Sequence, residues 1–308
     1  MRAKYLSALF LIASQFFPCA YARDIVLAFD STLTRSTALD GTARTKMLIN
    51  NMARADVKQA MFLIKTKTLT ANTINRMMYY DETGQLIVNA SHNYSLLHRA
   101  KSYGYPIDIM KAENALAPYV NYHNHITHPY LDGGGDAELQ QQLQRYLAEH
   151  NYFPVYVTTQ VHDEYMNKLY QARIESGRTV DIRALEKAYV KMIMDKVLAY
   201  DASAYLRLGT SPRQVLLLHE NDLAAYCIIG VIDALNEKGF NVIAPEKVFT
   251  DPVVNPYFVS NFTVNLLNRY LIGLPEAKRQ WPYMTSKKDQ AEIHAYLREQ
   301  GLEGLIPQ

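Results

Sequence analysis

The sequence predicts an α/β fold, a distorted (β/α) barrel of about seven strands with a C-terminal appendage, and two observations support this prediction. Short apolar runs rich in β-branched residues alternate repeatedly with helical patterns along the 308 residues. This alternation is typical of parallel strands joined by crossover helices. An open doubly wound sheet would also fit it. However, the chain contains neither G-x-G-x-x-G nor G-x-x-x-x-G-K, so we favour the barrel and expect no nucleotide cofactor.

The first 22 residues have the features of an export signal peptide. Arg2 and Lys4 form a basic start, an apolar run "YLSALFLIASQFF" follows, and Ala20-Tyr21-Ala22 provides a cleavage site with small residues. The apolar run is too short for a comfortable membrane span. We therefore expect an exported protein, periplasmic or secreted, with no transmembrane segment after cleavage.

Charge and cysteine usage narrow the expected partners. The chain has 32 basic and 30 acidic residues, and the signal carries two of the basic ones, so the mature chain is balanced. The mature chain has no surplus of basic residues, so its charge does not indicate nucleic acid as a partner. Removal of Cys19 leaves Cys227 alone, which excludes an internal disulfide. Cys227 lies in the apolar stretch "AAYCIIGVI" and is expected to pack in the core.

The elements of the barrel can be placed in order from their patterns. The expected strands share apolar, β-branched residues and lie at 24–29, 58–64, 85–91, 154–161, 213–219 and 240–244. The expected helices share apolar residues three or four positions apart and lie near 40–54, 70–80, 108–118, 133–152, 181–201 and 223–239. Thr70 and Asp108 are expected to cap two of these helices, and Gly239 to end the last. The domain then covers 23–254, and 255–308 is expected to be an extension packed on the barrel.

Polar residues recur where the expected strands end. The acids and imidazoles at these positions are Asp30, His92, His123, His125, His128, His162, Asp163, His219, Glu220 and Asp222. In (β/α) barrels the chemistry lies at the carboxyl ends of the strands. Any one of these residues could be a simple helix cap. Asp30, His92 and His219 taken together favour a functional site.

The order of these residues resembles the polysaccharide deacetylase family, the carbohydrate esterase family 4-like group with the NodB homology domain. The family motifs read T-F-D-D, H-[ST]-x-x-H, R-x-P-Y, an Asp with a Trp, and L-x-H. In this chain "AFDST", "HNYSL", "THPYLDGG" and "VLLLHEND" match the first, second, third and fifth motifs, and "YFPVYVTTQVHDEYMN" resembles the region of the fourth. The resemblance covers about residues 24 to 252.

The resemblance implies a metal-dependent hydrolase that removes N-acetyl groups from amino-sugar glycans. In the family, a divalent ion, zinc as a rule, is held by one Asp and two His residues, polarises the acetyl carbonyl and activates a water molecule. By the motif match, Asp30 is the general base and His219 the general acid that protonates the leaving amine. Asp163 is the residue nearest to motif four, and Glu164 stands where a Trp is expected.

The metal half of the family pattern is altered in this chain. His92 matches the first metal histidine, while Ser31 and Leu96 stand at the positions of the other two ligands. Thr127 stands where an arginine orients the base, and Tyr130 matches the residue whose backbone N–H faces the oxyanion. A hydroxyl and an aliphatic side chain are poor replacements for zinc ligands.

Two interpretations follow from this altered pattern. The first is an exported deacetylase whose metal site is weakened or rebuilt, for which His125 or His128 could join His92 as ligands. The second is a catalytically inactive pseudoenzyme that binds a glycan or a protein partner. Ser31 and Leu96 are the residues that separate the two, because loss of the ion would remove the largest single catalytic contribution.

Overall fold

The computed structural model describes residues 23–35, 37–93, 104–128, 137–251 and 285–307. Its strands are β1 Arg23–Asp30, β2 Met61–Ile64, β3 Leu86–Asn89, β4 Tyr122–Ile126, β5 Phe153–Pro154, β6 Thr159–Gln160, β7 Gln214–His219 and β8 Phe240–Val242. Its helices are α1 Gly41–Arg54, α2 Ile74–Glu82, α3 Gly104–Leu116, α4 Ala137–Glu149, α5 Asp163–Glu175, α6 Ile182–Leu208, α7 Asp222–Glu237 and α10 Lys287–Glu299. Short 3₁₀ turns are η1 Thr66–Thr68, η4 Pro245–Thr250 and η5 Glu303–Leu305.

All strand pairs in the sheet are parallel, in the order β5-β4-β3-β2-β1-β7-β6. β8 is outside this order and pairs with the first residues of β1. Parallel order places the carboxyl ends of all strands at one end of the sheet. The polar residues that follow the strands are therefore gathered there.

The sheet is closed by a short piece of chain. β5 and β6 lie at opposite ends of the strand order, yet only residues 155–158 separate them. The Val155 N–H donates to the Ile126 carbonyl at 2.7 Å, and the Thr158 N–H donates to the Val215 carbonyl at 3.0 Å. Because residues 155–158 span at most about 14 Å, the two edges of the sheet must lie close together. The sheet is therefore curled into a distorted half-barrel, as the sequence predicts.

Alternation along the strands separates two faces of the sheet. In β1, Val26 and Ala28 belong to the cluster inside the barrel, whereas Ile25, Leu27 and Phe29 pack in the cluster outside it. The same alternation places Val215 and Leu217 of β7 inside and Leu216 and Leu218 outside. Both faces of these central strands are buried, which explains their continuous apolar sequence.

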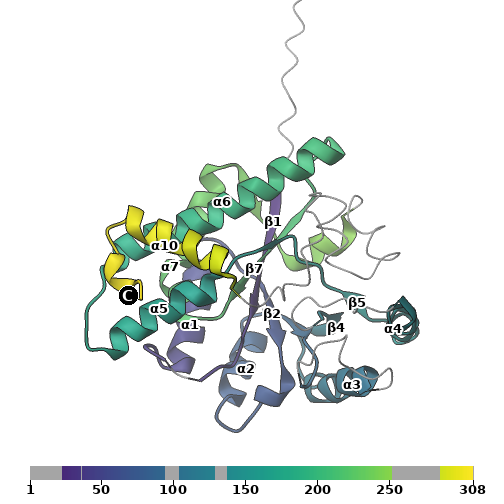
Figure 1. Cartoon of the computed structure of the whole chain (residues 1–308). Coiled ribbons are helices and arrows are strands. Elements are labelled where there is room, and N and C mark those ends of the chain that lie inside the picture. Colours follow the sequence, from purple (N-terminus) through teal and green to yellow (C-terminus); the bar gives the residue numbers. More distant parts are fainter. Residues whose placement is uncertain (1–22, 36, 94–103, 129–136, 252–284, 308) are drawn as a thin grey trace, which may run out of the picture.

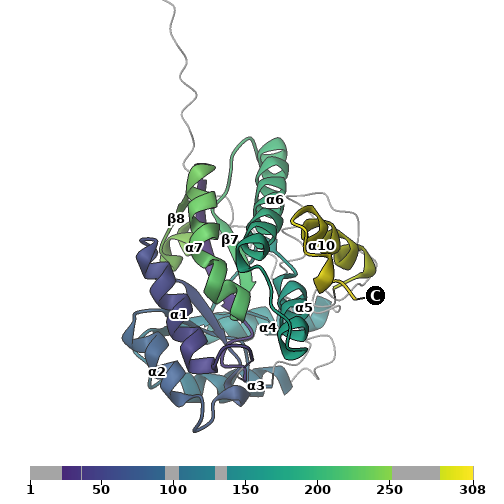
Figure 2. The same cartoon turned by 90° about the vertical axis from the view of Figure 1, so that its left-hand side faces the viewer.

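Helices cover the outer face of the sheet. α7 packs between α1 and α6 on one side of β1 and β7, and α10 packs on α6 (Figure 1). A second view shows α10 and the C-terminus beside α5 and α6 (Figure 2). α10 buries Ile293 and Leu297 in the outer cluster, and Lys196 of α6 bonds to Glu292 at 2.9 Å. The described C-terminal residues thus belong to the helical layer of the barrel.

The structure confirms the fold class and most of the expected elements, and corrects several boundaries. The expected strand 154–161 is divided into β5 and β6, because it crosses between the two edges of the sheet. α2 begins at Ile74 with Thr73 at its N-cap, so Thr70 is not the cap. Asp108 is not a cap either: it lies inside α3, and its side chain accepts hydrogen bonds from Asn93.

Two helices, α5 and α10, were not expected from the sequence. α6 also continues seven residues beyond the expected end at 201, to Leu208, where Gly209 adopts a positive φ of 69°. Cys227 is buried in the outer cluster, where burial raises the pKa of its thiol. Its expected packing role is confirmed.

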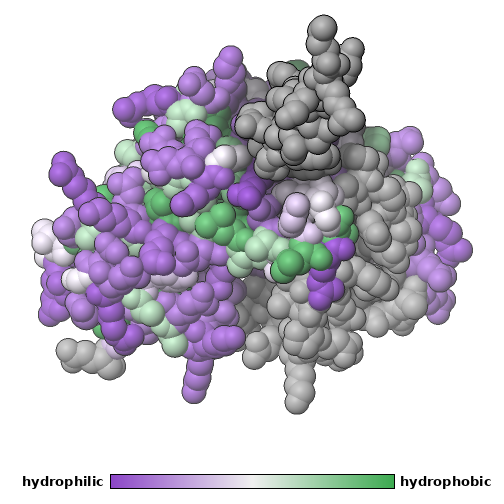
Figure 3. Space-filling model, turned by 90° about the horizontal axis from the view of Figure 1, so that it is seen from above, coloured by the Kyte–Doolittle hydropathy of each residue, from purple (hydrophilic) through white to green (hydrophobic). Residues whose placement is uncertain are grey.

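The described surface offers few other indications of function. None of the helices in the described ranges is both long and apolar enough to cross a bilayer. Seen from above, the described surface is mostly hydrophilic, with hydrophobic residues in a band near the centre of the view (Figure 3). Single exposed apolar side chains are normal for a folded domain. The polar residues at the strand ends are therefore the better candidates for a site.

Candidate functional site

Asp30 and His219 are neighbours across two adjacent strands. They are register partners at the ends of β1 and β7, and adjacent parallel strands lie about 4.8 Å apart. By alternation, both side chains lie on the face that carries Val26, Ala28 and Leu217, which is the inside of the barrel. The structure therefore brings together the two residues that the motif match assigns as base and acid.

Asp163 lies behind His219 as a fully buried partner. Its Oδ1 accepts a hydrogen bond from His219 Nδ1 at 2.6 Å, and its Oδ2 accepts from the His219 backbone N–H at 3.1 Å. Oδ2 also accepts from Asn221 Nδ2 at 2.9 Å. Asp163 is the first residue of α5, where the helix dipole favours a negative charge. This carboxylate fixes the orientation of the imidazole and does not face a ligand directly.

Glu164 holds the other ring nitrogen of His219. Its Oε2 lies 2.8 Å from His219 Nε2, and its side chain is 39% exposed. Two carboxylates thus bracket one imidazole, so both ring nitrogens act as donors. Burial alone would lower the pKa of His219, but the charges and hydrogen bonds of Asp163 and Glu164 outweigh it and raise the pKa well above 6.5. Burial would raise the pKa of Glu164, but the bond to His219 lowers it. These opposite shifts are those of an imidazolium–carboxylate pair.

Ser31 presents its hydroxyl at the end of β1. It is exposed and has a positive φ of 51°, and its N–H donates to Asp30 Oδ1 at 2.6 Å. Thr32 next to it is buried and donates to the Leu63 carbonyl. The position that carries a carboxylate in the family motif therefore offers only an alcohol oxygen, which is a weak zinc ligand.

His92 lies beyond the end of β3 and is tied to the neighbouring loop. Its Nδ1 and Thr66 Oγ1 are 2.9 Å apart, and its backbone carbonyl accepts from the Lys67 N–H at 3.1 Å. A partner on Nδ1 is the usual way to orient a metal-binding imidazole. Leu96, at the position of the second metal histidine, lies outside the described residues.

His125 lies on a different part of the barrel. Its ring stacks on Phe249 of η4, with centroids 4.1 Å apart, and within the described residues its Nδ1 has no hydrogen-bond partner. Burial and then the charge of His123 lower the pKa of His125 to about 4. η4 lies near the start of β7, since Lys247 accepts a bond from Arg213. His125 therefore points toward the amino ends of the strands, away from the end where His92 lies.

His128 and Thr127 lie just past β4. His128 Nδ1 lies 2.9 Å from the hydroxyl of Tyr105 on α3, a residue of a third, smaller cluster formed by α3, β4 and α4. Thr127 is buried, and its N–H donates to the Asn89 carbonyl at 2.9 Å. Tyr130, the expected oxyanion residue, lies outside the described residues. The described contacts thus direct His125 away from His92, whereas His128 contacts Tyr105 in the first turn of α3, the helix whose Asp108 carbonyl accepts from the His92 N–H.

The donors that the described residues provide at the carboxyl end do not form a zinc site. Across the described ranges, no three or more His, Cys, Asp or Glu side chains are grouped so that they could hold a metal ion. What the motif positions provide is one imidazole, His92, and one hydroxyl, Ser31. A catalytic zinc needs three protein ligands. We therefore derive no chemical step through a metal for this chain.

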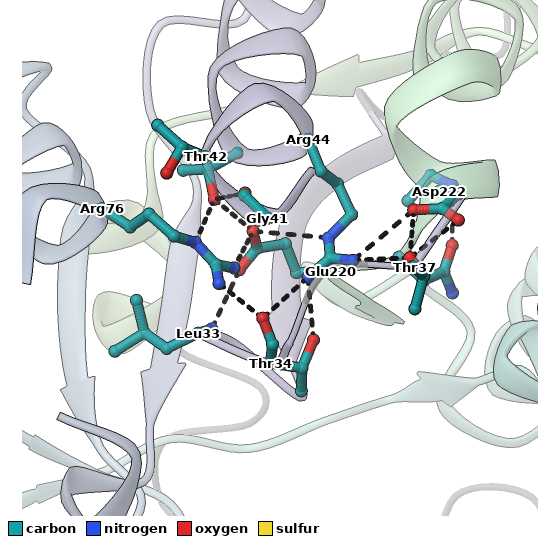
Figure 4. Close-up of polar contacts among 12 residues, drawn as sticks. Leu33, Thr34, Thr37, Gly41, Thr42, Arg44, Arg76, Glu220 and Asp222 are labelled. Carbon is teal, nitrogen blue, oxygen red and sulfur yellow. Dashed lines mark hydrogen bonds and ion pairs between the residues drawn. The ribbon is translucent and has the colours of Figure 1, made fainter. Parts of the chain in front are cut away.

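A second polar cluster lies on the other side of the end of β7. We call it the Glu220 cluster, and it contains Thr37, Arg44, Thr45, Arg76, Tyr80, Glu220 and Asp222. Arg76 Nη2 donates to Glu220 Oε1 at 2.7 Å, and Arg44 Nη1 lies 3.5 Å from Asp222 Oδ1. Arg44 and Arg76 approach the two acids from different directions beneath the β1–α1 loop (Figure 4). These arginines and acids are almost completely buried.

Sequence reasoning missed two features of this region. Glu164 was noted only as a replacement for Trp, because no helix was expected to begin at Asp163. The signal was the acidic pair in front of "YMNKLYQARIE", which is typical of a helix N-terminus. The Glu220 cluster was missed because its arginines lie on two other helices. No local pattern reports such a long-range pairing.

Comparisons with known proteins agree on the fold. No family model matches the sequence, and no curated protein is significantly similar to it. Among solved structures, a carbohydrate esterase family 4 pseudoenzyme from Bacillus anthracis is similar with a TM-score of 0.50 at 12% identity, over 73% of this chain and 65% of that one. This chain therefore spans less than two thirds of the length of that protein.

Two further structures agree with this result. A mutant of the same pseudoenzyme, with restored enzymatic activity, has a TM-score of 0.51 at 12% identity over 73% of this chain and 67% of that one. The family 4 domain of a multidomain xylanase from the hindgut metagenome of Trinervitermes trinervoides has a TM-score of 0.50 at 14% identity, over 74% of this chain and 89% of that one. At such low identity the likeness shows the fold alone.

Proposed function

From the premise that the chain has the NodB-like deacetylase fold, we propose that it is an exported pseudoenzyme that binds an amino-sugar glycan at the carboxyl ends of β1, β3 and β7. In this proposal it retains the acid–base half of the deacetylase site but not the metal half. Export rests on the N-terminal pattern of Arg2, Lys4 and the apolar run that follows them.

The observation that carries the proposal is that carboxylates occupy both ring nitrogens of His219. A histidine that protonates a leaving amine must direct an N–H toward it. In this chain Nδ1 is bonded to Asp163 and Nε2 to Glu164, so neither N–H is directed at a substrate. Together with a hydroxyl at position 31, this arrangement supports binding without hydrolysis.

The structural likeness supports the proposal from another direction. The Bacillus anthracis protein is itself a pseudoenzyme of carbohydrate esterase family 4, and a mutant of it has restored enzymatic activity. A NodB-like fold therefore occurs without catalysis in at least one protein. In that protein, activity can be regained by mutation.

A second candidate function is a deacetylase with weakened activity. It is favoured by the intact pair of Asp163 and His219 and by Asp30, which is the register partner of His219. In this alternative, Glu164 would have to leave His219 before the imidazolium could donate its Nε2 proton. Asp30 would take the proton of the attacking water.

The test compares the mature chain from Arg23 with the double variant Ser31→Asp, Leu96→His. We expect the parent to bind chitooligosaccharides in a calorimetric titration and to release no acetate, with or without added zinc. The double variant should bind zinc at least about tenfold more tightly than the parent, because it restores two ligands of a three-ligand site. His92→Ala in the double variant should remove this gain.

Each result separates the two functions. Zinc-dependent acetate release by the parent, lost in His92→Ala, would replace our proposal with the second candidate. Absence of binding to any acetylated or deacetylated chitooligosaccharide would refute glycan binding. If the double variant binds zinc no better than the parent, the match of Ser31 and Leu96 to the family ligands is wrong.

A further inference from the structure

We infer that Glu164 makes this site select amino sugars with a free amino group over their N-acetylated forms. The inference rests on the proposed glycan binding and adds the class of sugar that is bound. It starts from the hydrogen bond between Glu164 Oε2 and His219 Nε2 at 2.8 Å. Sequence matching assigns no role to this residue beyond noting that a Trp is expected there.

The first step concerns the donors that the site can offer. An acetamido group presents a carbonyl oxygen, which must find an N–H or O–H donor when it leaves water. His219 has two N–H groups, and they are directed to Asp163 and Glu164. Thr127, at the position of the family arginine, is buried and provides no positive charge. Beside His219, the described side chains therefore give an acetyl carbonyl little compensation, and the remaining donors are the Ser31 hydroxyl and the His92 ring at the ends of β1 and β3.

The second step concerns the acceptors. A carboxylate has two oxygens and about four acceptor positions, and His219 takes one of those on Oε2. Glu164 is 39% exposed, so the rest of its carboxylate is accessible to a ligand. Groups of this kind bind donors, and they bind a charged donor most strongly.

The third step is the charge balance around His219. Asp163 and Glu164 carry two negative charges against the single positive charge of the imidazolium that lies between them. His162, whose charge also lowers the pKa of Glu164, lies 3.5 Å from Asp289 of α10. A protonated amine would therefore enter a region of net negative charge, whereas an acetamido group gains nothing from it. In the enzymes of this fold class, a bound divalent ion would reverse this balance.

The test is a calorimetric titration of the mature chain with the tetramers of glucosamine and of N-acetylglucosamine at pH 5.5. At this pH the amines are protonated and Glu164, whose pKa lies below 4.5, is ionised. We expect glucosamine tetramer to bind about fivefold more tightly, the size expected for one partly exposed ion pair. Glu164→Gln should abolish this preference, since the amide keeps the shape and loses the charge.

The matched control is Glu175→Gln, which removes the same charge from the exposed other end of α5. It should keep the preference for the free amine. If Glu175→Gln abolishes the preference as well, the effect is general surface attraction of a polycation and the inference is overturned. Equal or tighter binding of the acetylated tetramer also overturns it, while leaving the proposed function intact. If neither tetramer binds, the proposed function itself fails.

Discussion

Two charged clusters meet at the end of β7, and they differ in how much of their charged side chains is exposed to solvent. His219 and Glu220 are consecutive residues of "HEND", so their side chains lie on opposite faces of the sheet. Glu220 faces α1 and α2 and is enclosed by donors on all sides, with a side chain that is 0% exposed. His219 lies between the buried Asp163 and the partly exposed Glu164.

The difference indicates which cluster stabilises the fold and which meets a ligand. The Glu220 cluster ties the β1–α1 loop to β7: Glu220 accepts from the Leu33 N–H and from Thr45, while Arg76 donates to the Thr34 carbonyl. A Cβ at Gly41 would come within 2.9 Å of Arg76 Nη1, so a larger residue there would displace this guanidinium. The acids of this cluster are bonded to partners inside the protein, and within the described residues only Arg44 Nε, 4.0 Å from Glu220 Oε1, makes no hydrogen bond there. Glu164 retains an exposed carboxylate, so the His219 side is where a ligand can compete.

The largest expected effect is that of Glu220→Gln, which removes the charge of the buried carboxylate in the Glu220 cluster. The amide cannot neutralise Arg44 and Arg76, which are 1% and 3% exposed. Leaving a buried charge without its partner costs about 3–5 kcal/mol. The free energy of unfolding, measured with urea at pH 7, should fall by this amount.

The control for that experiment is Glu237→Gln, which makes the same chemical change at an exposed position at the end of the neighbouring helix, α7. It should change the free energy of unfolding by no more than about 0.5 kcal/mol. A loss below about 1 kcal/mol in Glu220→Gln would show that the arginines find other acceptors. The structural role we give to the cluster would then be wrong.

A smaller effect is expected from Asp163→Asn, which removes the buried partner of His219. Asp163 accepts a charge-assisted bond from Nδ1, and such bonds contribute about 1.5–3 kcal/mol. Because folding raises the pKa of His219 above 6.5, this stabilisation is fully present below pH 6.5 and is lost as pH rises through the folded pKa. The difference between parent and variant should therefore be larger at pH 6 than at pH 9.

Two measurements accompany this variant. Urea unfolding at both pH values gives the stability difference, and an NMR titration of the ring gives the pKa of His219, which should fall in Asp163→Asn. His150→Gln is the control, because His150 lies on the exposed end of α4 and touches neither carboxylate. A stability difference that is the same at pH 6 and pH 9 would contradict the ion-paired state of His219.

The two clusters also show what could be predicted from the sequence. The strands, their parallel order and the convergence of Asp30 and His219 follow from apolar alternation, which is a local signal. Glu164 was overlooked because its partner is 55 residues away in the chain and the helix that positions it was not expected. In the sequence, Arg44 and Arg76 are indistinguishable from exposed polar residues of amphipathic helices. Only the packing of α1 and α2 shows that they are buried. The expected rebuilding of a metal site by His125 or His128 depended on side-chain direction, which loop sequence does not determine.

The smallest expected effect on stability is that of Glu164→Gln, and its pH dependence sharpens the comparison. Because Glu164 is 39% exposed, solvent screens its ion pair and the stability change should stay below about 1 kcal/mol. Its pKa is lowered by His219, so its contribution is present above pH 4.5 and is lost as pH falls through the folded pKa. The contribution also decreases as pH rises from 6.5 through the raised pKa of folded His219. Urea unfolding from pH 3 to 9 should therefore show the largest difference near pH 5–6, and none in Glu175→Gln.

A loss comparable to that of Glu220→Gln at every pH would mean that Glu164 is a structural residue. The ligand-facing role that distinguishes the two clusters would then have to be given up.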